Sequence, residues 1–340
     1  MKIRIAFRLV LLLFCLISTV IGVQRDSDAM TKQKYTIAWQ SMVGEEFQVF
    51  MADLDNPANP AQITKDKNGS QHPSLPKNGN RIYYFHLFTT SWGEGDQLFY
   101  MDLPDGKERM VQRNAIHFED DPCVSRDSST LAYCSKQTLE GEYGTDNWEI
   151  ICLKTDFSIA SRVTTDIDEE MDPSLSGDGK YVYFTIKMLK DRTGIEKKAL
   201  KDAAKEKDEE IDEESDDFKY KTLMNIYKNS FDGSNLERVT PRDYNAWHPS
   251  VSADEKWMAF ASDKDGNEEI YIMDLETYEV TRLTDCAGYD GHPCISSDGQ
   301  IIVFVSDRDG DKEIFSMDRF GHNLVQLTDN EIEDDSPTIT

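Results

Sequence analysis

An internal repeat constrains the fold of this chain more than any other feature of the sequence. Residues 247–284 and 291–328 align without a gap at a spacing of 44 residues, which places Pro249 over Pro293. Periods of roughly 20–50 residues are typical of solenoids, propellers and other repeat arrays. Each copy therefore predicts one structural unit that buries its surface against its neighbours rather than folding alone.

Weaker copies of the same pattern precede this pair. They open with an X-Pro dipeptide at His72, Asp121 and Asp172, and each continues with a short apolar run. The first copy starts at Tyr35 without an opening strand, whereas residues 336–340 form an orphan opening strand at the other end. A ring closed by the C-terminal strand explains both ends, because five full repeats and one split repeat then make six units.

Each copy is typical of four short strands. Apolar and β-branched runs occur at 257–261 and 301–305, an alternating run occurs at 269–273, and turn dipeptides such as Asp298-Gly299 separate the runs. Four antiparallel strands at a period of about 40–45 residues describe a propeller blade. The sequence therefore predicts an all-β fold, a six-bladed β-propeller of four-stranded antiparallel blades over residues 35–340, closed by the C-terminal strand.

The first 22 residues predict a cleaved signal peptide. Basic residues precede an apolar run over 9–17, and small residues up to Gly22 suit signal-peptidase cleavage. The run is short for a spanning helix, which needs about 20 apolar residues. A lipid anchor on Cys15 is the weaker alternative, because Phe14 does not suit the small residue expected before such a cysteine. We expect a periplasmic or secreted protein without a stable membrane span, and a short segment over 23–34 before the propeller.

The charge of the chain restricts its partners. The sequence holds 37 basic and 64 acidic side chains, a formal net charge of −27. Such a field repels nucleic acid and anionic membranes, so we expect no nucleic-acid partner. Aromatic residues make up 10% of the chain, which is enough core material for an ordered fold rather than a disordered acidic chain. We expect a monomer that binds a protein or a small ligand.

Five cysteines follow the predicted cleavage site. Export permits disulfides, and an odd number leaves at least one thiol unpaired in a monomer. Cys286 and Cys294 flank a short loop, and Cys123 and Cys134 resemble partners across a hairpin, for which Cys152 could compete. Buried free thiols are an equal alternative, so the sequence leaves the pairing open.

The repeat resembles that of a known family. The order X-Pro-x-x-Ser-x-Asp-Gly, Phe-x-Ser, Asp-x-Asp-Gly, Glu-Ile-Tyr-x-Met-Asp and x-Leu-Thr is similar to the TolB-like, WD-like propeller repeat, closely over 247–328 and loosely over 72–187. The resemblance is specific for the fold and unspecific for function, since the repeat occurs in periplasmic TolB and in the propellers of prolyl-oligopeptidase-like peptidases. It implies the TolB C-terminal propeller, expected in this chain without the N-terminal α/β domain. The G-x-S-x-G motif of the peptidases is absent from the sequence.

A charged insertion over residues 188–222 interrupts blade four between its second and third strands. The part through Glu206 suits a surface helix with pairs of opposite charge, and an acidic block runs from Asp208 to Asp217. The expectation is a solvated arm. The functional alternative is a recognition arm for a basic partner.

The X-Pro dipeptides supply the candidate site. The opening strand of each blade is expected to be innermost, so the X residues should meet at one mouth of the central channel. Neutral imidazoles with carboxylates can bind a transition metal, and the metal candidates are His72, His248 and His292. The resemblance implies that a partner inserts at this mouth, and local capping of the backbone is a third reading. The six X residues are His72, Asp121, Asp172, His248, His292 and Ser336.

Other polar motifs are weaker. The loops 263–266 and 307–310 resemble the start of a calcium loop but lack its third oxygen ligand and its spaced glutamate. His86, His117 and His322 show no mutual spacing, and no Ser-His-Asp, Cys-His or paired-carboxylate arrangement emerges from the sequence.

We expect a binding scaffold that acts through its channel mouth rather than an enzyme, and we assign no catalytic residue. The expected state has no cofactor, with a transition metal or calcium left open. The alternative function is a metal-dependent enzyme that acts on an extracellular polymer, similar to the propeller-fold oligogalacturonate lyases, with metal on the three histidines. A third hypothesis is a structural module of a larger assembly.

Overall fold

The computed structural model describes residues 34–340 apart from 91–92, 112–118, 137–147, 166–167 and 192–219. Residues 36–340 form one unit, separate from 1–35. The predicted signal peptide and most of the predicted insertion lie outside the described residues. Within the part of the chain that is described, no helix has the length and apolar character needed to cross a membrane.

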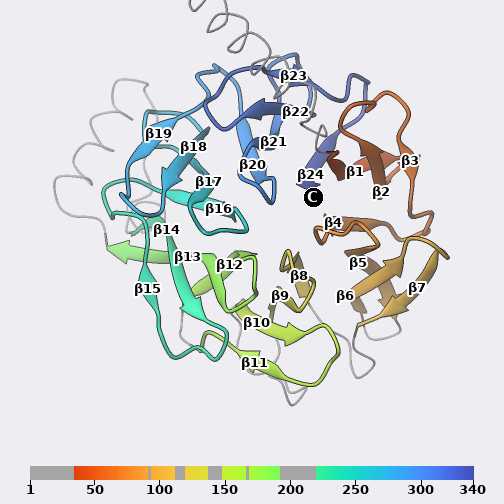
Figure 1. The fold of residues 1–340 in the computed structure, drawn as a ribbon, viewed down its shortest axis with the longest axis horizontal. Helices are drawn as coiled ribbons and strands as arrows, with labels where there is room; N and C mark the ends of the chain where they lie inside the picture. Colours follow the sequence, from red (N-terminus) through yellow and green to blue (C-terminus); the bar gives the residue numbers. More distant parts are fainter. Residues whose placement is uncertain (1–33, 91–92, 112–118, 137–147, 166–167, 192–219) are drawn as a thin grey trace, which may run out of the picture. The chain divides into compact units, whose positions relative to one another are not determined.

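Six four-stranded antiparallel sheets surround a central axis (Figure 1). Blade one contains β24 (Asp334–Ile339), β1 (Thr36–Val43), β2 (Glu46–Asp53) and β3 (Ala61–Gln62). Blade two contains β4 (Ser70–Ser74), β5 (Arg81–Thr90), β6 (Gly93–Asp102) and β7 (Lys107–Met110). Blade three contains β8 (Glu119–Val124), β9 (Thr130–Ser135), β10 (Glu149–Lys154) and β11 (Ala160–Arg162).

Blade four contains β12 (Glu169–Leu175), β13 (Tyr181–Asp191), β14 (Tyr220–Ser230) and β15 (Glu237–Arg238). Blade five contains β16 (Ala246–Val251), β17 (Trp257–Ser262), β18 (Glu269–Asp274) and β19 (Val280–Arg282). Blade six contains β20 (Asp290–Ile295), β21 (Ile301–Ser306), β22 (Glu313–Asp318) and β23 (Val325–Gln326). The innermost strands of blades one to six are β24, β4, β8, β12, β16 and β20 (Figure 1). The predicted six-bladed propeller is therefore confirmed.

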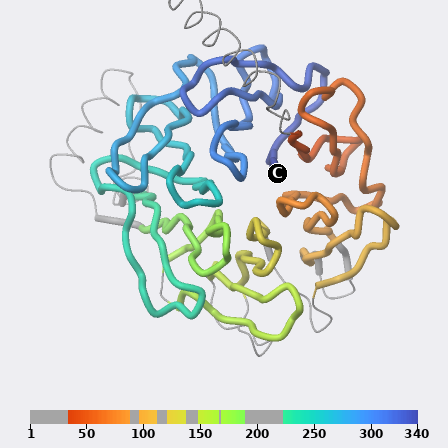
Figure 2. The backbone as a smooth tube through the Cα atoms, viewed as in Figure 1, coloured from red at the N-terminus to blue at the C-terminus, as the bar shows by residue number. Residues whose placement is uncertain are grey.

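The two ends of the ring meet in blade one. Strand β24 pairs antiparallel with β1, with Ile339 opposite Ile37 and Asp334 opposite Ser41. Beyond the strand, the Thr340 N–H donates to the carbonyl of Thr36 at 3.0 Å. Figure 2 shows the last strand, in blue, beside the red N-terminal strands. The C-terminal strand thus closes the ring, as the orphan strand in the sequence predicts.

The hydrophobic core lies between blades rather than within one blade. Successive side chains of a strand point to opposite faces of its sheet, and β9 illustrates the consequence. Its Leu131 and Tyr133 pack against blade two, while Ala132 and Cys134 pack against blade four. Each sheet therefore needs both neighbours to bury its two faces, which explains why the repeat must be closed.

The repeated motif residues have local roles in this fold. The threonine of each x-Leu-Thr motif accepts a hydrogen bond from the third strand, as from the Ile270 N–H to Thr284 at 2.9 Å. The serine of Ser-x-Asp-Gly closes the following turn, since Ser296 Oγ donates to Asp298 at 2.7 Å and Gly299 takes a φ of +68°. Glycine suits this left-handed position because it has no Cβ.

In the long hairpin of blade four, strand β13 ends and strand β14 begins inside the predicted insertion. Strands β13 and β14 pair without interruption from Tyr181 opposite Ser230 to Asp191 opposite Tyr220. Residues 188–191 and 220–222 therefore continue the ladder of the blade. The expected helix and the acidic block lie largely within 192–219, outside the described residues.

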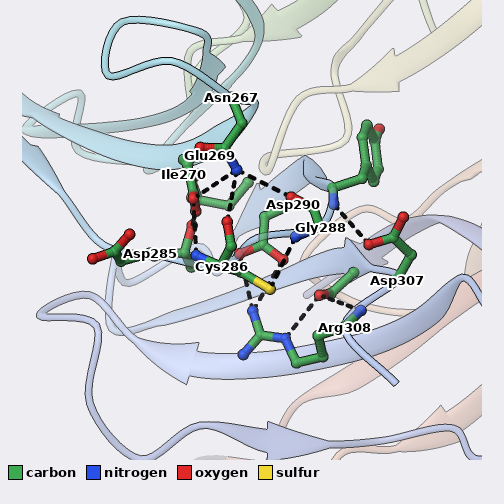
Figure 3. A network of polar contacts seen from close by, with 12 residues as sticks. Asn267, Glu269, Ile270, Asp285, Cys286, Gly288, Asp290, Asp307 and Arg308 are labelled. Carbon is green, nitrogen blue, oxygen red and sulfur yellow. Dashed lines mark hydrogen bonds and ion pairs between the residues drawn. The ribbon is translucent and has the colours of Figure 1, made fainter. Parts of the chain in front are cut away.

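Buried polar networks hold the linkers between blades (Figure 3). Glu269 is fully buried and accepts hydrogen bonds from Thr284 Oγ1 at 2.6 Å and the Cys286 N–H at 2.9 Å. Asn267 donates to the carbonyls of Cys286 at 2.7 Å and Gly288 at 3.1 Å. These contacts fix the chain where it passes from blade five to blade six.

Candidate functional site

The six X-Pro dipeptides form one bulge in each innermost strand. In blade five, for example, the pairing register shifts between Trp247 and Ser250, on either side of His248 and Pro249. A bulge leaves residues outside the ladder and re-aims their side chains. Proline, which has no N–H to donate, fits such a position. The bulges therefore turn the X residues toward the channel.

Every X residue adopts a left-handed backbone conformation. Their φ values lie between +47° at His292 and +55° at Asp172. Among residues other than glycine, asparagine, aspartate and histidine are those that tolerate this region best. The left-handed conformation therefore explains why His and Asp are frequent at X, and the sequence alone did not reveal it. The residues concerned are His72, Asp121, Asp172, His248, His292 and Ser336.

All six X residues line one pocket of about 360 Å³ on the channel axis. The prolines that follow them line it as well, and form an apolar collar beneath the polar ring. The volume lies in the range of small-ligand sites. The structure therefore brings together the complete set that the sequence proposed.

In four of the six blades, the residue after the X-Pro dipeptide forms a hydrogen bond to the next blade. Ser174 Oγ accepts the Val251 N–H at 3.1 Å, and Cys123 Sγ accepts the Leu175 N–H at 3.3 Å. Equivalent bonds to serine join blade two to three and blade five to six. At this level of the channel wall, hydrogen bonds therefore join blades two to six, each to the next.

Cys123 occupies one of these serine positions, which explains a cysteine there without a disulfide. None of the five cysteines that the structure describes forms a disulfide, so none of the bridges considered from the sequence is present. Burial raises the pKa of the Cys123 thiol to about 11. The thiol is therefore neutral at physiological pH and acts as a hydrogen-bonding group.

The histidines of the ring form three pairs with aspartates of neighbouring blades. His72 Nδ1 lies 2.9 Å from Asp121 Oδ1, and His248 Nε2 lies 3.4 Å from Asp172 Oδ1. The third pair joins His292 Nδ1 to Asp335, a residue that precedes Ser336 and was not among the predicted set. Its position next to an X residue was the only sequence signal for it.

The pKa values of the aspartates in the ring are shifted in different directions. Burial acts to raise the pKa of Asp121, but the neighbouring His72 outweighs it and lowers that pKa. Burial and the charge of Asp121 together raise the pKa of Asp172. Asp335 has a lowered pKa, because contacts with His292 and with Lys312 Nζ at 2.9 Å outweigh its burial. The ring therefore combines carboxyl groups with lowered pKa values and one, Asp172, with a raised pKa.

The three metal candidates do not converge. The rings of His248 and His292 meet edge to face with centroids 4.1 Å apart, and His72 instead faces Asp121. Burial, followed by the nearby His292, lowers the pKa of His248, whose Nδ1 is buried without a partner. Over the described ranges, no group of three His, Cys, Asp or Glu side chains is arranged to hold a metal ion.

The two Asp-rich loops use their carboxylates within the protein. Asp263 accepts from Asn245 Nδ2 at 2.8 Å, Asp265 accepts from Tyr271 Oη at 2.8 Å, and Asp307 accepts from the Tyr289 N–H at 2.7 Å. These bonds serve turn and linker geometry, and the calcium hypothesis stays a prediction.

A Ser-His-Asp contact that the sequence did not reveal lies in blade two. Ser70 Oγ is 3.0 Å from His86 Nδ1, and His86 Nε2 is 2.9 Å from Asp66 Oδ2. Ser70 is fully buried at the start of β4, so no substrate reaches its hydroxyl. The contact is a structural link between strands and the preceding linker, and the spacing of these three residues in the sequence did not indicate it. Of the other histidines, His322 lies in an exposed turn and His117 lies outside the described residues.

Comparisons with known proteins agree with the geometry. Residues 217–340 match the family described as the TolB beta propeller domain, so the chain carries TolB-type propeller repeats. No curated protein sequence matches.

Solved structures share the fold at low identity. TolB from Acinetobacter baumannii superposes with a TM-score of 0.65 at 20% identity, over 89% of this chain and 66% of that one. A putative TolB from Agrobacterium tumefaciens gives 0.59 at 17% identity, over 87% of this chain and 88% of that one. An oligogalacturonate lyase in complex with manganese gives 0.50 at 14% identity, over 87% of this chain and 74% of that one. At these identities the likeness shows the fold alone.

Proposed function

We propose that this protein is an exported binding scaffold that holds an extended protein segment or a small ligand in the pocket at its channel mouth. One observation carries the proposal: all six inner strands bulge at the same level and direct their X residues into a single 360 Å³ pocket. Left-handed backbone at non-glycine residues costs free energy, of order 1 kcal/mol or more at each position. A ring of six such residues around one cavity is consistent with selection for the cavity.

The lining suits a ligand with both polar and apolar parts. The X ring offers imidazoles, carboxyl groups and a hydroxyl, and the proline collar beneath it is apolar. Binding pockets combine an apolar wall with a few polar groups that fix orientation. Two features of the sequence support export. The N-terminal segment resembles a signal peptide, and the family's repeat also occurs in periplasmic proteins. The metal-dependent alternative gains no support from the positions of His72, His248 and His292.

The test is to block the mouth. Ser336→Tyr places a bulky ring at the smallest X residue, and Ser128→Tyr is the matched control because Ser128 is also a left-handed serine (φ +63°) away from the pocket. Linear peptides selected by phage display on the wild type, and hits from a small-molecule fragment library, are then measured against both variants. We expect affinity to fall at least tenfold in Ser336→Tyr and to persist in Ser128→Tyr. Hits that bind both variants equally, or an absence of hits, contradict the proposal.

A further inference from the structure

A side chain that the sequence analysis did not single out closes the pocket. Arg126 follows β8 in blade three and lines the pocket. Its Nη1 donates to the carbonyl of Ile339 at 2.7 Å and to that of Leu75 at 3.4 Å, and its Nη2 donates to the carbonyl of Ile295 at 2.8 Å. These carbonyls belong to blades one, two and six, so the side chain spans the channel from its own blade.

The guanidinium lies at the far end of the pocket from the X ring. Leu75, Ile295 and Ile339 each follow the X residue of their strand by three positions. At about 3.3 Å per strand residue, this separation is about 10 Å along the channel. The pocket is therefore a well with a polar rim, a proline collar and a cationic floor.

The cation on the floor has no anionic partner among the described residues. Its contacts are to neutral carbonyls, and two of its five N–H groups have no acceptor in that part of the chain. The aspartates at the rim are already paired with imidazoles, and Asp335 also with Lys312. A charge removed from water favours an opposite charge in direct contact. A guanidinium can bind a carboxylate through two parallel N–H groups. Arg126 has two N–H groups that no described residue accepts from.

We propose that Arg126 binds the carboxylate of a ligand whose apolar part occupies the proline collar. The chemistry is that of a short apolar acid, supplied either as a small molecule or as the free C-terminus of a peptide. The cavity has room for about twelve water molecules, which suits such a group. The inference rests on the proposed function, since it names the ligand class of the same pocket.

The net charge of −27 does not oppose this contact. At physiological ionic strength, fields from exposed charges are screened beyond about 8 Å, whereas Arg126 would touch the ligand directly. The acidic surface slows the approach of an anion from a distance. The direct contact with Arg126 determines how tightly the anion is bound once it has entered the pocket.

The experiment compares acids with their amides. Butyrate is measured against butyramide, and trialanine with a free C-terminus against trialanine amide, by calorimetry on the wild-type protein. We expect the carboxylate forms to bind about tenfold to a hundredfold more tightly, because hydrogen bonds to charged groups are the stronger ones. Tighter binding by butyrate identifies a small acid as the source, and tighter binding by trialanine identifies a chain end.

Variants then assign the effect to the floor. Arg126→Gln should abolish the preference for carboxylates, while Arg242→Gln, an exposed arginine away from the pocket, should retain it. Thermal melts check the folding of each variant. If Arg126→Gln does not fold, Arg126→Lys keeps the charge but loses the paired donors, and should weaken the preference.

The inference falls if acids and amides bind the wild type equally, if a folded Arg126→Gln protein keeps the preference, or if no probe binds. The scaffold proposal is judged separately by Ser336→Tyr. A peptide that loses affinity in that variant but binds equally with a free or amidated C-terminus would leave the proposed function in place and remove the role of Arg126.

Discussion

Blades five and six place a glutamate at the same position of the repeat, yet the pKa values of the two carboxyl groups are shifted in opposite directions. Glu269 and Glu313 each begin the third strand of their blade, and both are fully buried. Each accepts a backbone N–H from the following linker, from Cys286 at 2.9 Å and from Asn330 at 2.7 Å respectively. The bonds that the repeat supplies are therefore shared.

Their other neighbours differ. Burial acts to raise the pKa of Glu269, but its hydrogen bonds, including one from Arg282 Nη2 at 2.7 Å, outweigh burial and lower it. In blade six, Gln326 occupies the position of Arg282, and burial together with the charge of Asp334 raises the pKa of Glu313 to about 7. The repeat sets the geometry of this buried carboxyl group, whereas residues outside the motif set its pKa.

The largest expected effect of this difference is on stability at pH 8. Glu269→Gln removes the charge that faces Arg282 in a buried site, and we expect it to lower the free energy of unfolding by about 3 kcal/mol. Glu313→Gln removes a charge that the fold disfavours, and should be neutral or stabilising. Urea unfolding of both variants measures the two changes. Equal destabilisation by the two substitutions would show that the fold stabilises the two carboxylates equally, and would contradict the opposite pKa shifts.

The second effect is the pH dependence of stability. An acid whose folded pKa is raised binds more protons when folded, so its contribution to stability is full below its unfolded pKa near 4.5 and is lost as pH rises through about 7. Between pH 4.5 and pH 8, we expect the free energy of unfolding of the wild type to fall by about 2 kcal/mol more than that of the Glu313→Gln variant. Unfolding curves at several pH values test this, and parallel curves for the two proteins would contradict it.

The difference between features that the repeat determines and features that other residues determine also explains what the sequence could predict. The motif residues make contacts within a blade, as Thr284 and Ser296 do, so the repeat suffices to infer strand order and turns. Ring closure followed from the incomplete first copy and the orphan strand at 336–340. The X residues could be predicted for the same reason, because each occupies the same position in the opening strand of its own blade. Their left-handed backbone was missed because neither spacing nor composition reports a φ angle.

Contacts between blades could not be read from the repeat. The pairing of His292 with Asp335, and the reach of Arg126 to three other blades, join residues that are far apart in the sequence. At the position of Arg126, blades four, five and six carry the small residues Gly177, Ala253 and Ser297, and blade two carries Lys77. The chemistry of the pocket therefore depends on residues that differ between repeats, as the pKa of Glu313 does.

The smallest expected effect tests whether one such difference is sufficient. Gln326 and Arg282 occupy the same register, opposite Phe315 and Tyr271. Gln326→Arg should therefore bring a guanidinium to Glu313, lower its pKa and stabilise the protein at pH 8 by about 1 kcal/mol, a little below the value of a favourable charged hydrogen bond because the present contact of Gln326 with Asp309 is lost.

A double-mutant cycle isolates that interaction. In the Glu313→Gln background, Gln326→Arg has no carboxylate to meet, so the gain should vanish. The gain should also shrink at pH 5, where Glu313 is protonated in the parent protein. A gain that persists in the double mutant would mean that the arginine acts through the exposed acidic surface. The different pKa values of Glu269 and Glu313 would then have a cause other than the residue at this one position.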